Sequence, residues 1–265
     1  MFNLPTLETA LARTIYAGKL HFAPVTDSTN SDALAAARAG APHGSVYFAD
    51  EQLAGRGRGD HAWHSSAGQG LYVSILLRPS FSANRLPLLP LSAGLAAAQA
   101  THATTSLSVD LRWPNDLMIG PRKVGGILVE SKIETGGVAY AVVGIGINVH
   151  QRDFPANLST PATSLDLETA SRNSRQQLLI ELLKSIAREI LNLNEPTAIG
   201  VPQRVQQAST WMAGRRVQVH GPQACIGTTA GLDANGFLLV QTKTGLITVQ
   251  TGGLRAAEDG LADIS

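Results

Sequence analysis

The chain has 265 residues and a formal net charge of +1, which allow one large domain or a large domain with a small one and do not demand a nucleic-acid partner. A hydrophobic fraction of 44% is normal for a globular protein, and no run approaches the roughly 20 apolar residues of a membrane span. The N-terminal residues are not expected to form a signal peptide, since they lack a basic and an apolar region. Cys225 is the only cysteine, which excludes an internal disulfide and favours a cytoplasmic protein.

The first 80 residues predict helices and strands separated by one long loop. The N-cap residue types Asp27-Ser28-Thr29-Asn30 precede an alanine-rich helix. The segment 52–70 is rich in glycine and lacks apolar periodicity, and a loop of this length in a compact domain is usually functional. The expected elements are helices at 5–18 and 31–39 and strands at 20–25, 45–49 and 71–77.

The remainder of the chain predicts more strands, two helices and a change of pattern near residue 210. The apolar residues of 174–193 recur at helical spacing, whereas short strands and tight turns after Trp211 predict a small β-barrel. We expect helices at 91–102 and 174–193, and strands at 107–113, 116–119, 124–133, 138–147, 215–220, 225–232, 237–242 and 246–251. The fold class is therefore α+β: a mixed β-sheet with flanking helices in residues 1–208, followed by the barrel in 209–265.

The long loop contains Gly55-Arg56-Gly57-Arg58. Alternating glycines let a backbone approach a ligand closely, and arginine forks pair with carboxylate or phosphate. A flexible solvated turn explains this segment equally well. The spacing matches neither a dinucleotide-binding fingerprint nor a P-loop.

Arg112-Trp113-Pro114-Asn115-Asp116 is followed closely by Lys123, and the first segment is poor in regular-structure propensity. A carboxylate can hold Mg²⁺ or position a nucleophile, and a lysine can neutralise charge at a phosphorus centre. An ordinary turn is the alternative for Asn115-Asp116. Lys123 opens an otherwise apolar strand, which is an unusual place for a solvated lysine.

Trp63 and the segment 144–148 each allow two interpretations, and the histidines indicate no metal site. Trp63 either fills the core or offers a flat apolar face to a purine ring. Gly144-Ile145-Gly146-Ile147-Asn148 is either a plain strand end or a place of close ligand approach. The seven histidines show no metal spacing, so the metal ligands stay unknown.

In their order and spacing, these segments resemble the biotin protein ligases, the enzymes that biotinylate carboxylase carrier domains. The resemblance covers most of the chain, and it is carried by Asp27-Ser28-Thr29-Asn30, Gln52-x-x-Gly55-Arg56-Gly57-Arg58, Trp63, Leu71-Tyr72-Val73-Ser74, Arg112-Trp113-Pro114-Asn115-Asp116, Lys123-Val124-Gly125-Gly126-Ile127-Leu128-Val129-Glu130 and Gly144-Ile145-Gly146-Ile147-Asn148. The family loop commonly continues with further basic residues, whereas this chain has Gly59-Asp60-His61. Because the motif begins by residue 28, the resemblance is to the monofunctional class without an N-terminal DNA-binding domain.

The resemblance implies a class II synthetase-like catalytic domain followed by an SH3-like barrel. It implies ATP and Mg²⁺ as cofactors, biotin as substrate, and a biotin carboxyl carrier protein (an acetyl-CoA carboxylase subunit) as partner, with no DNA, no membrane and a possible homodimer. Biotin carboxylate would attack the α-phosphorus of ATP to give biotinyl-5′-AMP, and a carrier lysine would then take the biotinyl group.

The resemblance also implies roles for single residues. The implied catalytic residues are Lys123, Arg58 and Asp116, and the implied ATP-binding residues are Trp63, Asn115, Asp116 and Asn148. The implied biotin contacts are Ser28, Thr29, Asn30, Gln52, Gly55, Arg56, Gly57, Arg58, Lys123 and Gly126.

Three rival functions remain. A lipoate protein ligase shares the architecture and the acyl-adenylate chemistry, but the Gly-Arg-Gly-Arg loop and the terminal barrel favour biotin. A DNA-binding repressor is disfavoured by the near-zero charge and the missing recognition helix. An inactive carrier-binding module is disfavoured because Lys123, Asp116 and both loop arginines are present.

Overall fold

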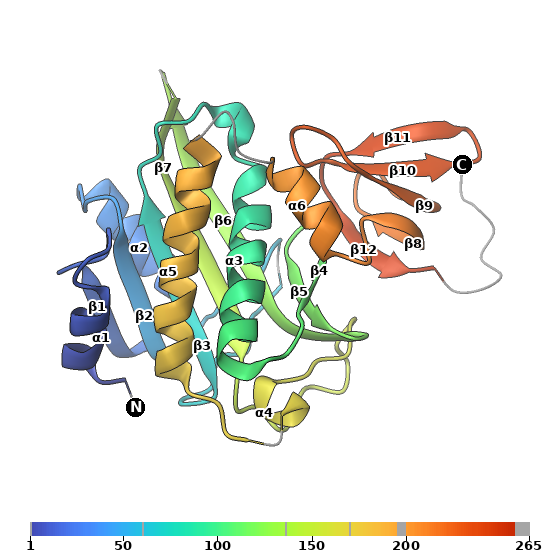
Figure 1. Cartoon of the computed structure of the whole chain (residues 1–265). Coiled ribbons are helices and arrows are strands. Elements are labelled where there is room, and N and C mark those ends of the chain that lie inside the picture. The colour runs from blue at the N-terminus through green and yellow to red at the C-terminus, as the bar shows by residue number, and fades with distance from the viewer. Residues whose placement is uncertain (1, 60, 136, 170, 195–199, 258–265) are drawn as a thin grey trace.

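A computed structural model of the chain describes residues 2–59, 61–135, 137–169, 171–194 and 200–257. It has a mixed seven-stranded sheet with helices against it and a second, five-stranded antiparallel sheet toward the C-terminus (Figure 1). The predicted α+β class is therefore confirmed. No helix in the described part of the chain has the length and apolarity required to cross a membrane.

The large sheet has the strand order β1-β2-β3-β7-β6-β5-β4. β1 and β2 run parallel, and the other neighbours pair antiparallel. The strands are β1 Leu20–Thr26, β2 Ser45–Gln52, β3 Gly70–Leu77, β4 Asp110–Arg112, β5 Asp116–Ile119, β6 Arg122–Glu134 and β7 Gly137–Asn148. The sequence motifs named above therefore lie on the central strands β3, β7 and β6, or in the segments that follow β1, β2 and β4.

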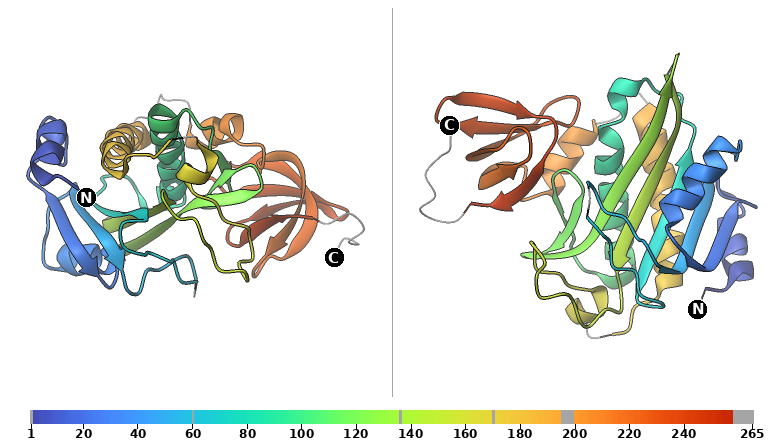
Figure 2. Two further views of the ribbon diagram at one scale, coloured as in Figure 1. Left: turned by 90° about the horizontal axis from the view of Figure 1, so that it is seen from below. Right: turned by 180° about the vertical axis from the view of Figure 1, so that it is seen from behind.

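The helices cover the two faces of this sheet unequally. They are α1 Leu4–Leu11, α2 Thr29–Arg38, η1 Ala83–Arg85, α3 Leu88–Thr105, α4 Leu165–Glu168, α5 Arg175–Asn194 and α6 Val201–Ala208. α3 and α5 lie side by side over one face (Figures 1 and 2), where the apolar stripe of α5 joins the main core. On the opposite face α2 packs Ala33 and Ala37 against Leu76 and Val142. That face is left partly free of helices.

The structure differs from the sequence-based elements at several ends. The first helix stops at Leu11 because the Thr14 hydroxyl donates to the Leu11 carbonyl at 2.7 Å and so competes with helical hydrogen bonding. The long loop folds back on itself as a hairpin, in which the Trp63 amide donates to the Gly55 carbonyl at 2.8 Å. The predicted elements omit η1, α4, α6 and β12.

The second sheet forms the C-terminal barrel, defined here as residues 213–256. Its strands are β8 Ala213–His220, β9 Cys225–Leu232, β10 Leu238–Thr242, β11 Gly245–Val249 and β12 Gly253–Ala256, in the order β11-β10-β9-β8-β12. The boundary at 208/209 stays a prediction.

The barrel is attached to the large sheet through the turn that ends at Gly236. The indole N–H of Trp113 donates to the Gly236 carbonyl at 3.0 Å. Gly236 has φ +83°, and an added Cβ would lie 2.7 Å from Leu91 Cδ1 of α3. A side chain at this position would therefore meet Leu91 and Leu88 of α3, and the positive φ also favours glycine in this turn.

Candidate active site

A cavity opens on the helix-poor face of the large sheet. It gathers residues from the start of α2, the long loop, β3, β6 and β7: Ser28, Thr29, Asn30, Gln52, Arg56, Gly57, Arg58, Trp63, Tyr72, Asn115, Lys123, Gly126, Ile127, Leu128, Gly144, Ile145 and Gly146. Most of the predicted site residues are thus brought together. Gly55, Asp116 and Asn148 are the predicted residues that do not line it.

Glycines on β6 and β7 form the floor of the cavity. An added Cβ on Gly144 would lie 2.0 Å from Asn30 Oδ1, and one on Gly146 would lie 2.5 Å from Trp63 Nε1. No side chain fits at either position. The alternation of residues 144 and 146 along a strand places both on this face, and the glycines let Asn30 and Trp63 lie directly on the sheet.

A buried network of polar side chains occupies one end of the cavity. The amide of Thr29 donates to Gln52 Oε1 at 2.9 Å, and the Thr29 hydroxyl lies 2.7 Å from Ser74 Oγ. Ser74 donates to Asn30 Oδ1 at 2.5 Å, and Asn30 donates to Glu130 at 2.9 Å. The network fixes the rotamers of Thr29, Asn30 and Gln52, as a specific polar site requires.

Ser28 holds the N-cap position of α2, but its side chain makes no capping hydrogen bond. The residue is only 3% exposed and lines the cavity. Its hydroxyl is therefore positioned by the helix end and remains available to a ligand.

Asp116 lies behind the cavity between two cations. Its Oδ1 is 2.5 Å from Lys123 Nζ, and its Oδ2 is 2.7 Å from Arg112 Nη2. Burial opposes ionisation most strongly, but the attraction of Lys123 and Arg112 prevails and holds the pKa of the Asp116 carboxyl below its ordinary value. Asp116 therefore fixes Lys123, whose side chain reaches the cavity.

Trp63 lies against the ammonium group of Lys123, with Nζ 5.6 Å from the ring centroid. Its indole N–H is buried, and no described residue accepts a hydrogen bond from it. An orphaned donor at a cavity wall is costly unless a ligand or water satisfies it.

The two arginines of the loop have different partners. Arg56 forms a bidentate pair with Glu130 of β6, with N–O distances of 3.1 and 2.7 Å. Arg58 donates to the Thr251 hydroxyl at 2.6 Å and to the Gly252 carbonyl, both in the turn before β12 of the C-terminal barrel. These two partners are neutral, and the predicted pairing of Arg58 with an anionic group stays a prediction.

Gly55, Asn115 and Asn148 each have a structural role within the protein. Asn115 donates to the Ile127 carbonyl at 2.7 Å, and Asn148 donates to the Thr163 carbonyl at 2.9 Å. An added Cβ on Gly55 would lie 2.4 Å from the Trp63 carbonyl, so this glycine permits the hairpin. The predicted ligand contacts of these residues stay predictions.

The predicted site residues did not include Tyr72, Ser74, Ile127, Leu128, Glu130 or the β7 glycines. Ser74 and Glu130 each interrupt an apolar strand, and this interruption is the sequence signal that could have identified them. Tyr72 gave no such signal. Its side chain reaches the cavity only because β3 pairs with β7.

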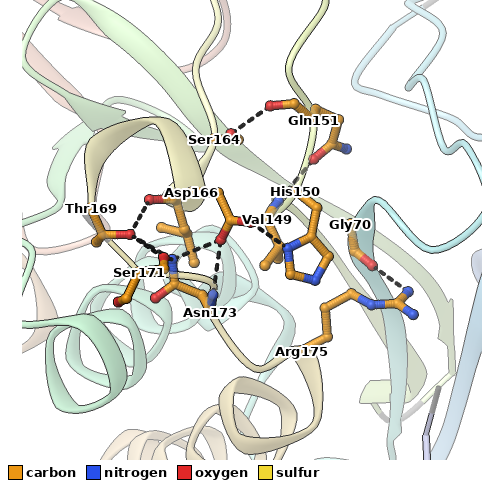
Figure 3. Close-up of polar contacts among 11 residues, drawn as sticks. Gly70, Val149, His150, Gln151, Ser164, Asp166, Thr169, Ser171, Asn173 and Arg175 are labelled. Atoms are coloured by element: carbon orange, nitrogen blue, oxygen red, sulfur yellow. Dashed lines mark hydrogen bonds and ion pairs between the residues drawn. The ribbon is translucent and has the colours of Figure 1, made fainter.

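A second polar cluster lies just beyond the C-terminal end of β7, after Asn148 (Figure 3). His150 Nδ1 lies 2.7 Å from Asp166 Oδ2, and Asn173 donates to Asp166 Oδ1 from both its backbone and its side chain at 2.9 Å. Ser164 donates to the Gln151 carbonyl at 2.6 Å. These bonds tie together the loops around α4, and none of these residues lines the cavity.

The described residues contain no group of three or more histidine, cysteine, aspartate or glutamate side chains arranged to hold a metal ion. Both oxygens of Asp116 already face cations. The described chain therefore offers no ready-made cage for Mg²⁺.

Comparisons with known proteins identify the family to which this chain belongs. A model of the biotin/lipoate A/B protein ligase family matches residues 22–148. The bifunctional ligase/repressor BirA of Bacillus subtilis is 33% identical over 84% of this chain and 69% of its own, and the biotin–[acetyl-CoA-carboxylase] ligase of Mycobacterium tuberculosis is 31% identical over 86% and 85%. The structure of the Aquifex aeolicus biotin protein ligase with biotin and ATP superposes with a TM-score of 0.78 at 30% identity, covering 91% of this chain and 100% of that one. The chain therefore belongs to the biotin protein ligases of this family.

Proposed function

We propose that this biotin protein ligase joins biotin to AMP, using ATP, and then transfers the biotinyl group to a lysine of a biotin carboxyl carrier protein. The observation that carries the proposal is the cavity itself, where a buried polar network, a fixed lysine and an arginine loop meet over a glycine floor. The Aquifex aeolicus structure contains biotin and ATP, and the Mycobacterium tuberculosis relative is named for acetyl-CoA carboxylase.

The first step brings a carboxylate and a phosphate together, so positive charge is required where they meet. Lys123 supplies it from a fixed position, because Asp116 holds the ammonium group at 2.5 Å. Arg58 supplies it from the loop. The carboxylate oxygen bonds to the α-phosphorus, the bond to the bridging oxygen breaks, and pyrophosphate leaves with the electron pair.

In the second step the neutral amine of a carrier lysine attacks the acyl carbon of biotinyl-5′-AMP. The acyl–oxygen bond breaks, AMP leaves with its electron pair, and the amine loses a proton. The mixed anhydride is sensitive to water, so a cover is required between the two steps. The hairpin that carries Arg56 and Arg58 is the proposed cover.

The polar network is the proposed binding site for the ureido ring of biotin, which offers N–H donors and a carbonyl acceptor. Ser28, Thr29, Asn30 and Gln52 present hydroxyl and amide groups of both kinds there. The proposed nucleotide residues are Trp63, Asn115, Asp116 and Asn148, and the orphaned indole N–H of Trp63 supports a ligand acceptor beside it.

Mg²⁺ is proposed to arrive with ATP. A magnesium ion typically keeps several waters and binds through one or two carboxylates together with substrate phosphates. Since Asp116 is already engaged by Lys123 and Arg112, the phosphates would hold most of the ion, which supplies charge neutralisation when bound.

The test is ATP–pyrophosphate exchange with biotin, lipoate and octanoate as alternative acids, followed by mass spectrometry of an added carrier domain. Exchange that depends on biotin, and a biotinyl mass increase on the carrier, are expected. Exchange with lipoate alone would contradict the proposal in favour of the lipoate ligase alternative.

We also propose that this chain does not bind DNA, although relatives such as the Bacillus subtilis protein are named ligase and repressor. A gel shift with operator DNA at physiological salt should show no complex that survives competitor DNA. The proposed homodimer is tested by analytical ultracentrifugation with and without biotin and ATP.

A further inference from the structure

The arginine loop is held from two sides by two parts of the protein. Arg56 is tied to the large sheet through the carboxylate of Glu130, and Arg58 is tied to the C-terminal barrel through Thr251 and Gly252. Thr251 and Arg58 are 193 residues apart in the chain. The loop therefore bridges the two sheets beside the cavity.

The barrel end of this bridge is built to stay in place. Gly252 is buried and has φ +143°, and an added Cβ would lie 2.4 Å from the His220 carbonyl of β8. β12 follows directly and pairs with β8 from Gly253 to Ala256. The Gly252 carbonyl and the Thr251 hydroxyl are thus presented to Arg58 from a fixed turn.

The two anchors differ in charge. The carboxylate of Glu130 neutralises Arg56, whereas a hydroxyl and a carbonyl hold Arg58 without neutralising it. Among the described residues, Arg58 has no carboxylate within ion-pair distance. A guanidinium has five N–H donors, so Arg58 keeps both its charge and several donors for an anion in the cavity.

We infer that Thr251 of the C-terminal barrel is a positioning residue for the ligase reaction, because it fixes Arg58 over the cavity while leaving its charge uncompensated. The inference rests on the proposed function. It gives the barrel a part in keeping the loop closed over biotinyl-5′-AMP, and it assigns that part to one hydroxyl group.

The test compares Thr251→Val with Thr251→Ser and with the control Thr248→Val, which alters an exposed threonine of the same barrel. Loss of one hydrogen bond to a charged group should raise the rate of biotinyl-5′-AMP release roughly 10-fold to 150-fold. Labelling of a bystander lysine-rich protein should rise with it. Thr251→Ser should restore the wild-type rate, and Thr248→Val should leave it unchanged.

A double-mutant cycle makes the inference specific. Arg58→Gly should itself raise the release of biotinyl-5′-AMP and bystander labelling. Adding Thr251→Val should change neither further, because each substitution removes the same contact between Arg58 and Thr251. Additive effects would overturn the inference. So would a Thr251→Val protein that releases the adenylate no faster than Thr248→Val.

A readout without substrates separates this inference from the proposed function. In the empty protein, Thr251→Val should speed hydrogen exchange of the loop amides at 55–59 while leaving the barrel amides and the melting temperature unchanged. Failure of the wild type to make biotinyl-5′-AMP would contradict the proposed function alone. Unchanged hydrogen exchange of the loop amides in Thr251→Val would contradict the positioning role of Thr251, whatever the activity.

Discussion

Asp116 and Asp166 occupy similar surroundings and have different consequences. Each lies in a polar cluster, and each has a pKa below its ordinary value: burial opposes ionisation most strongly in both, and cations around Asp116, or hydrogen bonds from Asn173 and His150 around Asp166, outweigh it. Lys123, the partner of Asp116, reaches the cavity. The partners of Asp166 are His150 and Asn173, which join loop segments and do not line the cavity (Figure 3).

A carboxylate with a lowered pKa is therefore no sign of catalysis by itself. Structural ion pairs shift pKa values as catalytic ones do. The distinguishing feature here is whether one partner reaches the space where a substrate fits. The following substitutions separate the two clusters, beginning with the largest expected effect.

Asp116→Asn should lower the free energy of unfolding by about 3–5 kcal/mol, because Arg112 and Lys123 lose their shared counter-charge in a buried site. The folded-state pKa of Asp116 lies below its unfolded value, so its stabilisation is complete above the unfolded pKa and is lost as pH falls through the folded pKa. Urea unfolding should therefore show a smaller acid loss of stability in the variant than in the wild type. Equal loss in both would contradict the assignment.

Lys123→Ala should reduce adenylation by about 10²–10³, the usual cost of losing one charge-stabilising donor, while the fold stays intact. Lys123→Arg should rescue poorly, because a planar fork replaces a compact charge. Pyrophosphate exchange measures both. Lys132→Ala, at an exposed lysine paired with Glu134, is the control, and near wild-type exchange in Lys123→Ala would refute the role.

Trp63→Ala should weaken ATP binding more than biotin binding, with lost stacking and burial costing about 1–3 kcal/mol. Gly146→Ala should reproduce the effect, since its methyl group would lie 2.5 Å from the indole nitrogen and displace the ring. Isothermal calorimetry of each ligand checks this. A larger loss for biotin would mean that the indole faces biotin.

Asp166→Asn should cost about 1–3 kcal/mol of unfolding free energy, through weakened hydrogen bonds to His150 and Asn173. Pyrophosphate exchange should not change, because the cluster does not line the cavity. Thermal unfolding and the exchange assay are run on the same preparation. Loss of exchange in a folded variant would show that the loops around α4 take part in the chemistry.

Much of the site was predictable because the chain keeps its ligand-facing residues in short, unusual segments. Thr29, Gln52, Arg58, Trp63 and Lys123 were expected at the site, and the structure brings them to one cavity. Local sequence also predicted the strands and the long helix, since these have clear periodicity.

What the sequence did not reveal depends on contacts between distant residues. The Arg58–Thr251 contact joins residues 193 apart, and no local pattern predicts it. β12 begins with Gly253 directly after Gly252, so propensity there favours a turn. The pairing of Arg112 and Lys123 on one carboxylate depends on the register of β5 with its neighbours β4 and β6.

The Gly236 turn limits how this enzyme can be recombined with its relatives. Its carbonyl accepts the indole N–H of Trp113, and its backbone lies where a side chain would strike α3. A barrel transplanted from another ligase must therefore bring a glycine at this position and a turn of the same length. Chimeras designed only by matching the domain boundary in sequence would lose the contacts of Gly236 with Trp113 and α3, even when the large sheet and the barrel each fold.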